Sequence, residues 1–425
     1  MKTKTAKGPD GITAMTVGGF KSITEPARIE IRPLTILAGA NSSGKSSMMQ
    51  PLLLLKQTLE ADNDPGPLLL DGPNVRFTSV DQVLSKGTKG VPTNSFQIEI
   101  EAGGSSVNLK FAKKGSKRGV EVRQTVVSHG VESMVMRPGM KHEEIYLAIP
   151  SSYKTEGGIV RDGGFDFNWK VVQNRFFLSF LYGDGSFRFQ LSWPEQIIEP
   201  HLTRLIHLPG LRGNPERAYP AYDDIQNFPG TFEHYMADMI ADWQMLRDAR
   251  LYQLSNWLEM MGLTWKVEAK YLSDTLIELR VGRSPKKTKT SSKDMVNLAD
   301  VGLGVSQVLP VLVALLAAEP GQMVYLEQPE IHLHPRAKMA LAQILVEAVK
   351  RGVRIVAETH SSLLLRGIQT LVARGDLDPE MIKLHWFQRD PDNGMTTVSS
   401  ADLDENGVSG SCPKDFDQMI LETEE

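Results

Sequence analysis

Cysteine is almost absent from this chain, which has a single one, Cys412, in 425 residues. One thiol cannot form an intrachain disulfide, so a disulfide-stapled scaffold is excluded and the composition is typical of a reducing compartment. Long apolar runs are also missing. The longest, Val308 to Ala318, is too short to span a bilayer and contains Pro310. The N-terminal MKTKTAKGPDG has basic residues but no apolar stretch behind them, unlike a secretory signal. We therefore expect a cytoplasmic protein that does not enter a membrane.

Charge of one sign is not in excess either. The chain carries 51 acidic and 47 basic residues, a formal net charge of −4, so overall basicity gives no support for nucleic-acid binding. One basic, polar segment, SPKKTKTSSK at 284–293, leaves a local DNA contact open, although such a composition favours a solvated loop. A length of 425 residues with 41% hydrophobic residues is typical of two or three globular units.

The apolar pattern divides the chain into four regions. Residues 1–95 hold an apolar strand that ends at Gly39 and a helix that follows it. Residues 96–230 contain short runs that alternate apolar and polar residues, which predicts a mostly antiparallel sheet. In residues 231–296 apolar residues first recur at three- and four-residue intervals, which predicts a helical insertion followed by connecting strands. Residues 297–425 alternate apolar strands with helices, the pattern of a mostly parallel sheet.

Residues 39–46 read GANSSGKS and match the phosphate-binding pattern G-x-x-x-x-G-K-[ST] at every position. Glycines let backbone N–H groups curl around phosphate, and the helix that follows offers its positive end. Lys45 can reach the β- and γ-phosphates of a nucleotide, and the Ser46 hydroxyl can bind Mg²⁺. The candidate nucleotide-binding residues of this loop are Gly39, Asn41, Ser42, Ser43, Gly44, Lys45, Ser46 and Ser47.

Glu327 closes the apolar run MVYLE. An acid at such a strand end holds the magnesium shell, provided that its strand neighbours the strand before the phosphate loop. Gln328 follows, where a water-activating acid is usually expected. A neutral amide cannot take a proton from water but can orient the water by hydrogen bonds, so Glu330 stays open as the alternative base. His360 ends another apolar run, VAETH, at a strand end where α/β sheets place ligands.

The segment DVGLGVSQ at 300–307 precedes an apolar helical run. Small residues and a serine at a helix start form either a second phosphate-receptive surface or a plain N-cap. The residues alone leave both readings open. Gly304 and Ser306 are the candidates for a phosphate contact.

Taken in order, the loop at 39–46, GVSQ at 304–307, LEQPEIHLHP at 326–335 and ETHS at 358–361 resemble the ATP-binding heads of the SMC and OLD-nuclease branch of ABC-type ATPases. They are most similar to a bacterial group of ABC-like ATPases with E-Q-P-E-x-H-L-H-P, in which Gln at the second acid position looks native. The resemblance implies an α/β fold, an ABC-type ATPase head with a mostly parallel P-loop sheet, an antiparallel β lobe and a helical insertion. It covers residues 15–60 and 297–400 well.

The resemblance also implies roles for the candidate residues. Lys45 and Ser46 would bind the phosphates of ATP and its Mg²⁺, Glu327 would be the Walker B acid that binds Mg²⁺, and His360 would be the switch histidine. Gly304 and Ser306 would be the signature that meets the γ-phosphate on the other subunit, which implies a homodimer that sandwiches ATP. The D-loop falls at 332–335. Asp81 and Gln82 are position-based candidates for a Q-loop that the sequence does not show clearly.

The function expected from this resemblance is an ATP-gated dimeric switch that hydrolyses ATP slowly and controls DNA engagement or a separate effector, a nuclease or toxin, in bacterial defence. A fused Toprim nuclease of the OLD type is not expected, because only 65 residues follow His360. Two alternatives stay open. An ATPase subunit of a membrane transporter is disfavoured by the long insertion, and a P-loop kinase would phosphorylate a small molecule without dimerising.

Overall fold

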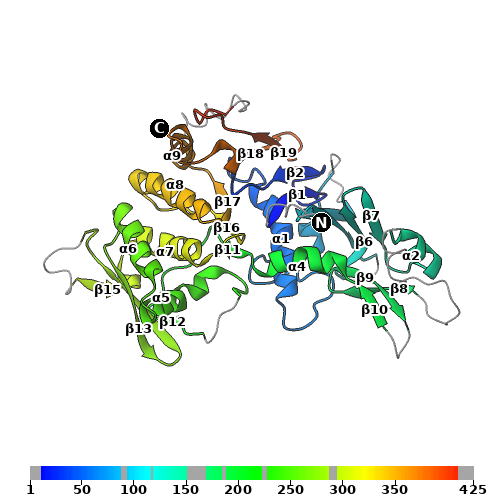
Figure 1. Ribbon diagram of the computed structural model, residues 1–425, viewed down its shortest axis with the longest axis horizontal. Coiled ribbons are helices and arrows are strands. Elements are labelled where there is room, and N and C mark those ends of the chain that lie inside the picture. Colours follow the sequence, from blue (N-terminus) through cyan, green and yellow to red (C-terminus); the bar gives the residue numbers. More distant parts are fainter. Residues whose placement is uncertain are drawn as a thin grey trace, which may run out of the picture. The chain divides into compact units, whose positions relative to one another are not determined.

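A computed structural model describes residues 11–87, 93–115, 118–150, 169–183, 188–222, 227–286 and 294–409. The chain divides into two units that are each built from separate stretches of sequence (Figure 1). The first comprises residues 1–30, 46–203 and 388–398, and the second comprises residues 31–45, 204–387 and 399–425. Cys412 and most of the basic segment at 284–293, from residue 287 onward, lie outside the described residues.

The second unit contains most of a six-stranded sheet. Its strands, in spatial order, are β11 (Ile206–Leu208), β16 (Met323–Glu327), β17 (Arg354–Thr359), β3 (Leu34–Gly39), β18 (Ile382–Arg389) and β19 (Thr396–Ala401). From β11 to β18 the neighbours are all parallel. All residues of β3 and β17 are buried, as expected for strands with both faces covered. The mostly parallel P-loop sheet predicted from the alternating pattern is confirmed.

The condition attached to the Glu327 prediction is not met. Strand β16 does not neighbour β3, because β17 lies between them, and a role for Glu327 in binding Mg²⁺ stays a prediction. The register pairs Glu327 with Glu358 on β17, and Thr359 with Ala38 on β3, so the three strands end at the same edge. Two interstrand steps separate β16 from β3, about 10 Å in the hydrogen-bonding direction. His360, which follows β17, therefore stands between the loop and Glu327.

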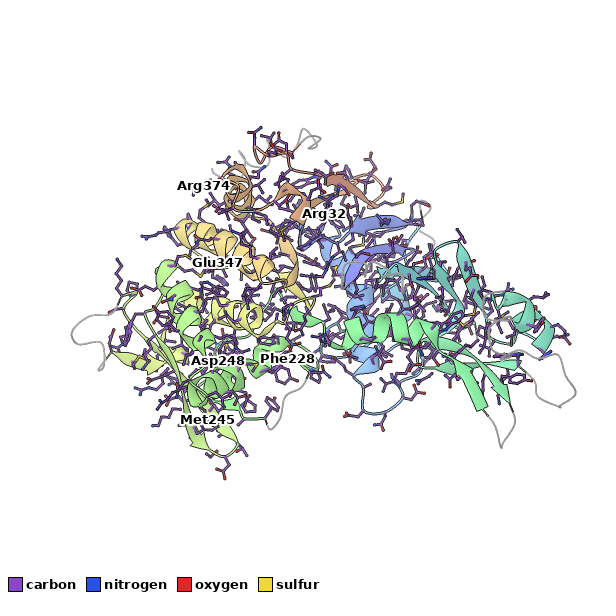
Figure 2. The ribbon with its side chains drawn as sticks, viewed as in Figure 1. Arg32, Phe228, Met245, Asp248, Glu347 and Arg374 are labelled. Atoms are coloured by element: carbon purple, nitrogen blue, oxygen red, sulfur yellow. The ribbon has the colours of Figure 1, made fainter. Side chains whose placement is uncertain are left out.

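Helices cover this sheet and connect its strands. They are α7 (Leu303–Ala317), α8 (Pro335–Lys350) and α9 (Ser362–Ala373), of which α7 contacts β16 and α8 contacts β17 and β3 (Figure 1). Helix α8 begins at Pro335, whose fixed φ suits a first helical position, and α9 begins after Ser361, whose hydroxyl accepts the Leu364 N–H. Each site strand is thus followed by a helix with a defined start. At the amino ends of β3 and β18, Arg32 donates to the Ile382 carbonyl at 3.0 Å; Figure 2 labels Arg32.

The helical insertion belongs to the same unit. A short 3₁₀ turn (Phe232–Tyr235) leads into α5 (Met236–Met245), and α6 (Ala249–Met260) follows, with Asp248 capping its first turn. The Trp257 indole N–H donates to Glu347 of α8 at 2.7 Å, which ties α6 to the helix after β16 (Figure 2). The connecting strands are β12 (Tyr219–Pro220), β13 (Val267–Ser273), β14 (Leu276–Gly282) and β15 (Met295–Asn297), with 3₁₀ turns at Leu298–Asp300 and Pro379–Met381.

The first unit contains antiparallel sheets, which combine strands from residues 96–203 of the predicted β-rich lobe with two strands from residues 12–30. Its larger sheet has the order β2 (Ala27–Glu30), β1 (Ile12–Gly18), β4 (Ser95–Ala102), β5 (Ser105–Lys113), β6 (Val120–His129) and β7 (Glu132–Met136), with every neighbouring pair antiparallel. A smaller meander holds β8 (Trp169–Asn174), β9 (Phe177–Gly183) and β10 (Arg188–Leu191), and the helices are α1 (Lys45–Leu59), α2 (His142–Ala148) and α4 (Trp193–Thr203), with a 3₁₀ turn at Val80–Gln82. The mixed α/β fold class is therefore confirmed. Among the described residues no helix combines the length and apolar character needed to cross a membrane.

Candidate functional site

The loop after β3 has the backbone of an anion cradle. Gly39, Ser42 and Gly44 have φ values of 147°, 60° and 104°, in the left-handed region. Ser42 and Gly44 flank Ser43, which is not left-handed, and such alternation turns successive N–H groups toward one side of the chain, where an anion can bind. Gly39 has a second reason to be glycine, because a Cβ there would lie 2.4 Å from the Phe387 carbonyl oxygen. The tight turn therefore depends on the residue that the motif places there.

The side chain of Lys45 is folded back over this loop. Its Nζ donates to the carbonyl oxygens of Gly39 at 3.0 Å and Ala40 at 2.7 Å, and the residue is only 4% exposed. Burial lowers the pKa of Lys45 to about 8, opposed by the charges of Glu358 and Glu330. The ammonium is thus a buried cation whose close partners are loop oxygens, and a phosphate could replace these oxygens as its partner.

His360 joins the same cluster from the end of β17. Its Nδ1 lies 2.7 Å from the Gly39 carbonyl oxygen, so the Nδ1–H donates to that carbonyl, and 3.4 Å from Nζ of Lys45. Burial lowers the pKa of His360, and the neighbouring Lys45 charge lowers it further, although the bond to Gly39 acts in the opposite direction. A neutral His360 with its proton on Nδ1 leaves Nε2 as an acceptor.

Glu327 has partners on the other side of its strand. One carboxylate oxygen lies 3.2 Å from Nε2 of His207, and the other accepts the Gly210 N–H at 3.1 Å. Burial alone would raise the pKa of Glu327, but the bonds and charge from His207 and the Gly210 N–H together bring it below its usual value. The carboxylate is therefore ionised at neutral pH, as a magnesium ligand must be.

Gln328 has an unusual backbone. Its φ is 45°, a conformation that costs a non-glycine residue about 1–2 kcal/mol. Its N–H donates to the Glu358 carbonyl at 2.9 Å, and its carbonyl accepts from Nη2 of Arg212 at 3.1 Å. These bonds hold the main chain of Gln328 in a sharp turn directly after β16. Strain of this kind is concentrated at functional sites.

Glu330 lies beneath the end of β17. Its Oε1 accepts hydrogen bonds from the Thr359 hydroxyl and, at 3.3 Å, from the His360 N–H, and the residue is 5% exposed. Its Oε2 is buried without a hydrogen-bond partner among the described residues. Burial raises the pKa of Glu330 despite these bonds. This carboxyl orients His360, and its burial makes it a poor candidate for direct contact with a hydrolytic water.

Sequence reasoning missed several residues of this edge. The Tyr325 hydroxyl donates to Glu358, and its ring stacks on His207 with centroids 5.3 Å apart. Burial raises the pKa of Tyr325 well above its usual value, so the hydroxyl keeps its proton. Residues 207–213 read HLPGLRG, and the proline and glycines of this segment were its only sequence signal. Glu358 belongs to the motif ETHS, but the sequence assigned it no role.

The other candidates differ in accessibility. Asn41 and Ser42 are exposed, Ser43 and Ser47 are buried, and Ser46 is half-buried in the first turn of α1. At the start of α7, Ser306 is 6% exposed and its hydroxyl donates to the Leu303 carbonyl, whereas Leu303 is 45% exposed and Gly304 is half-buried. Asp81 forms an ion pair with Lys113, and Gln82 accepts the Thr78 N–H. Their roles in nucleotide binding stay predictions.

The carboxylates at this edge suit a metal ion that is bound partly by the protein and partly by a nucleotide. Within the described part of the chain no group of three or more His, Cys, Asp or Glu side chains is placed to hold a metal ion. Mg²⁺ is commonly bound by one or two carboxylates together with nucleotide phosphates rather than by an all-protein cage. The ionised Glu327 carboxylate fits that mode of binding.

Comparison with protein families finds one partial match. The AAA_21 model, described as "AAA domain, putative AbiEii toxin, Type IV TA system", matches residues 162–366. That range includes Glu327, Gln328, Glu330 and His360 but not the phosphate loop. No curated protein matches the chain.

Similar solved structures are heads of SMC proteins. An SMC head bound to the C-winged-helix domain of ScpA is 13% identical, with a TM-score of 0.49 over 93% of this chain and 98% of that chain. The SMC head domain from Thermotoga maritima is 10% identical, with a TM-score of 0.38 over 92% and 98%. An SMC head with an extended coiled coil, bound to the C-terminal domain of ScpA derived from Pyrococcus furiosus, is 11% identical, with a TM-score of 0.46 over 98% and 100%.

The geometry of Gly39 can be tested by Gly39→Ala. The added Cβ would meet the Phe387 carbonyl oxygen at 2.4 Å, so we expect a loss of about 2 kcal/mol or more in the free energy of unfolding, measured by urea denaturation. Gly66→Ala is the matched control, because Gly66 has a φ of 81° but no atom within 4 Å of the added Cβ. Equal losses in the two variants would contradict a steric role for Gly39.

Proposed function

We propose that this chain binds ATP with Mg²⁺ at residues 39–46 and hydrolyses it slowly. The observation that carries the proposal is the position of the Lys45 ammonium, held by loop carbonyls at the edge where β3, β17 and β16 end. Buried cations are costly unless they are paired, and here a triphosphate would be the stronger partner. The family match over residues 162–366 supports a P-loop ATPase for the second half of the site.

Each residue of the proposed site has a task that its surroundings allow. Lys45 binds the β- and γ-phosphates, and Ser46 and Glu327 hold the magnesium. Bound Mg²⁺ neutralises charge on the phosphates and orients them. His360 donates its Nδ1–H to the Gly39 carbonyl, so its Nε2 remains an acceptor that could bind a water molecule near the γ-phosphate.

Slow turnover follows from the chemistry at position 328. Gln328 can orient a water molecule but cannot take its proton, and the acid nearest in sequence, Glu330, is buried and bonded to Thr359 and His360. The protein would therefore stay in the ATP-bound state for longer than an ATPase with a carboxylate base. Such a lifetime suits a switch better than a motor.

We infer that the switch is a homodimer closed by ATP. At the start of α7 the N-cap Gly302 and Leu303 are exposed, so the positive end of this helix is open to a phosphate. Ser306 contributes to the same helix start by bonding the Leu303 carbonyl. In the proposed dimer this end of α7 meets the nucleotide held by the other copy.

The proposed output is control of a separate effector, a nuclease or toxin, or of DNA engagement in bacterial defence. The description of the matched family, a putative AbiEii toxin of a Type IV toxin–antitoxin system, supports this setting. Affinity purification from the native host, followed by identification of co-purifying chains, tests the proposal. A defence effector retained only with ATP would support it, whereas a membrane permease would favour the transporter alternative.

Nucleotide affinity should depend on Lys45 and on pH. Below pH 8 the ammonium is charged in both free and bound protein, so affinity is constant. Above pH 8 Lys45 loses its proton in the free protein, whereas a bound phosphate keeps Lys45 protonated. The affinity for ATP should therefore fall by up to tenfold per pH unit. Lys45→Ala should raise the Kd for ATP about 10- to 100-fold and remove this pH dependence, as measured by calorimetry. An unchanged Kd in the variant would refute the assignment.

Turnover should respond to a base at position 328. Gln328→Glu supplies a carboxylate at the turn, and general-base catalysis is typically worth about 10²–10⁴-fold, so we expect kcat to rise at least tenfold in a phosphate-release assay. Glu330→Gln, added to the Gln328→Glu protein, should leave its kcat raised. No gain from Gln328→Glu would instead assign the base to Glu330.

Dimerisation should require ATP and the exposed start of α7. Light scattering should show twice the monomer mass with ATP and Mg²⁺, and Leu303→Asp should prevent this by placing a negative charge beside the triphosphate. Met339→Asp is the matched control, because Met339 is similarly exposed, at 40%, but lies on α8. Nucleotide-independent mass, or equal effects of the two variants, would count against the sandwich.

A further inference from the structure

A loop that is distant in sequence holds the turn after β16. It comprises residues 209–213 and follows β11, which is the parallel neighbour of β16. His207 of β11 and Gly210 of the loop bind the Glu327 carboxylate. Arg212 instead donates to main-chain carbonyls, two in the turn after β16 and one in its own loop.

The Arg212 guanidinium lies across the end of β16. Its Nη2 donates to the Gln328 carbonyl at 3.1 Å, and its Nη1 donates to the carbonyls of Pro209 at 3.1 Å and Glu327 at 3.4 Å. The residue is 4% exposed. The planar fork of a guanidinium suits two carbonyl groups at a fixed separation, which the single ammonium of a lysine cannot match. Arg212 thus fixes the orientation of the peptide that joins Glu327 to Gln328 and of the peptide after it.

This contact falls at the strained residue. Gln328 has a left-handed backbone, which an ordinary side chain adopts only when its surroundings hold it there. Its N–H is held by the Glu358 carbonyl, and its carbonyl accepts from Ile331 N–H at 3.2 Å as well as from Arg212. Of these partners, Arg212 is the only one that acts through a side chain, so it is the one that substitution can remove.

The loop is itself anchored. The Gln307 side chain, on α7, donates to the Gly213 carbonyl at 3.0 Å, and Gln307 is buried. The residue after Arg212 is therefore bonded to α7, the helix that starts at Leu303. A guanidinium on an anchored loop has a defined position from which to orient its target.

We propose that Arg212 is a positioning residue for hydrolysis, which sets the direction of the Gln328 side chain toward the attacking water without taking part in ATP binding. The inference rests on the proposed ATPase function. Two tasks, ATP binding and hydrolysis, would then be carried by different residues at the same edge of the sheet. Lys45 and the phosphate loop determine affinity, and Arg212 determines the rate of the chemical step.

Arg354 provides a matched control. It is buried to a similar degree, 7% exposed, and its guanidinium also binds a main-chain carbonyl, that of Ile31. It lies at the amino end of β17, whereas the site lies at the carboxyl end of the same sheet. Loss of either arginine removes a buried guanidinium, but only Arg212 contacts the turn at Gln328.

The test compares Arg212→Met, Arg212→Lys and Arg354→Met with the unaltered chain, using single-turnover ATP hydrolysis, the Kd for ATP and the thermal midpoint Tm. Arg212→Met should slow single-turnover hydrolysis about 10- to 100-fold with a Kd within threefold of the original, because a displaced catalytic group costs rate and not affinity. The hydrolysis rate of Arg212→Lys should lie between those of Arg212→Met and the unaltered chain. Arg354→Met should lower Tm and leave the rate within threefold.

Three outcomes would overturn the inference. The first is a hydrolysis rate of Arg212→Met within twofold of that of the unaltered chain. The second is a loss of rate and of ATP affinity in equal proportion in that variant. If Arg212→Met does not fold, Arg212→Lys decides: a fall of threefold or more supports the role, and an unchanged rate overturns it. The third is no ATP hydrolysis by the unaltered chain, which contradicts the proposed function itself and removes this inference with it.

Discussion

The burial of one cation, the Lys45 ammonium, is the constraint on which the site depends. An ammonium removed from water must be paired, and here the close partners are carbonyl oxygens of Gly39 and Ala40, with Glu358 and Glu330 as nearby negative charges. The loop must turn sharply to present those oxygens, which explains the left-handed glycine and the close approach to Phe387. Carbonyl oxygens are weaker partners than phosphate, so the geometry that pairs the Lys45 ammonium with the loop also suits a triphosphate.

The order of the strands determines where the other residues of the candidate site lie. Because β17 lies between β3 and β16, His360 is placed between the phosphate loop and Glu327, and Glu330 reaches back to hold the His360 backbone. On the outer side of β16, β11 supplies His207 and the loop after β11 supplies Arg212. The main chain of Gln328, the proposed water-orienting residue, is therefore bonded on one side by Glu358 of β17 and on the other by Arg212 of this loop.

Much of this edge could be predicted from the sequence because the strands are apolar runs that stop at a functional residue. Gly39, Glu327 and His360 each end such a run. The rest could not be predicted. Strand β11 has only three residues, too few for a period to show, and it pairs with a strand more than a hundred positions later, so nothing local indicated His207 or Arg212. The intervening position of β17 likewise depends on long-range pairing, and the bond from Ser306 to its own helix start depends on side-chain geometry.

A crystal structure of the chain with a non-hydrolysable ATP analogue and Mg²⁺ tests the central claim most directly. The account predicts that Lys45 Nζ leaves the Ala40 carbonyl and lies within hydrogen-bond distance of oxygens on the β- and γ-phosphates, with the triphosphate enclosed by residues 39–46. A nucleotide bound elsewhere, or one bound here while Nζ remains on the Gly39 and Ala40 carbonyls, would contradict it.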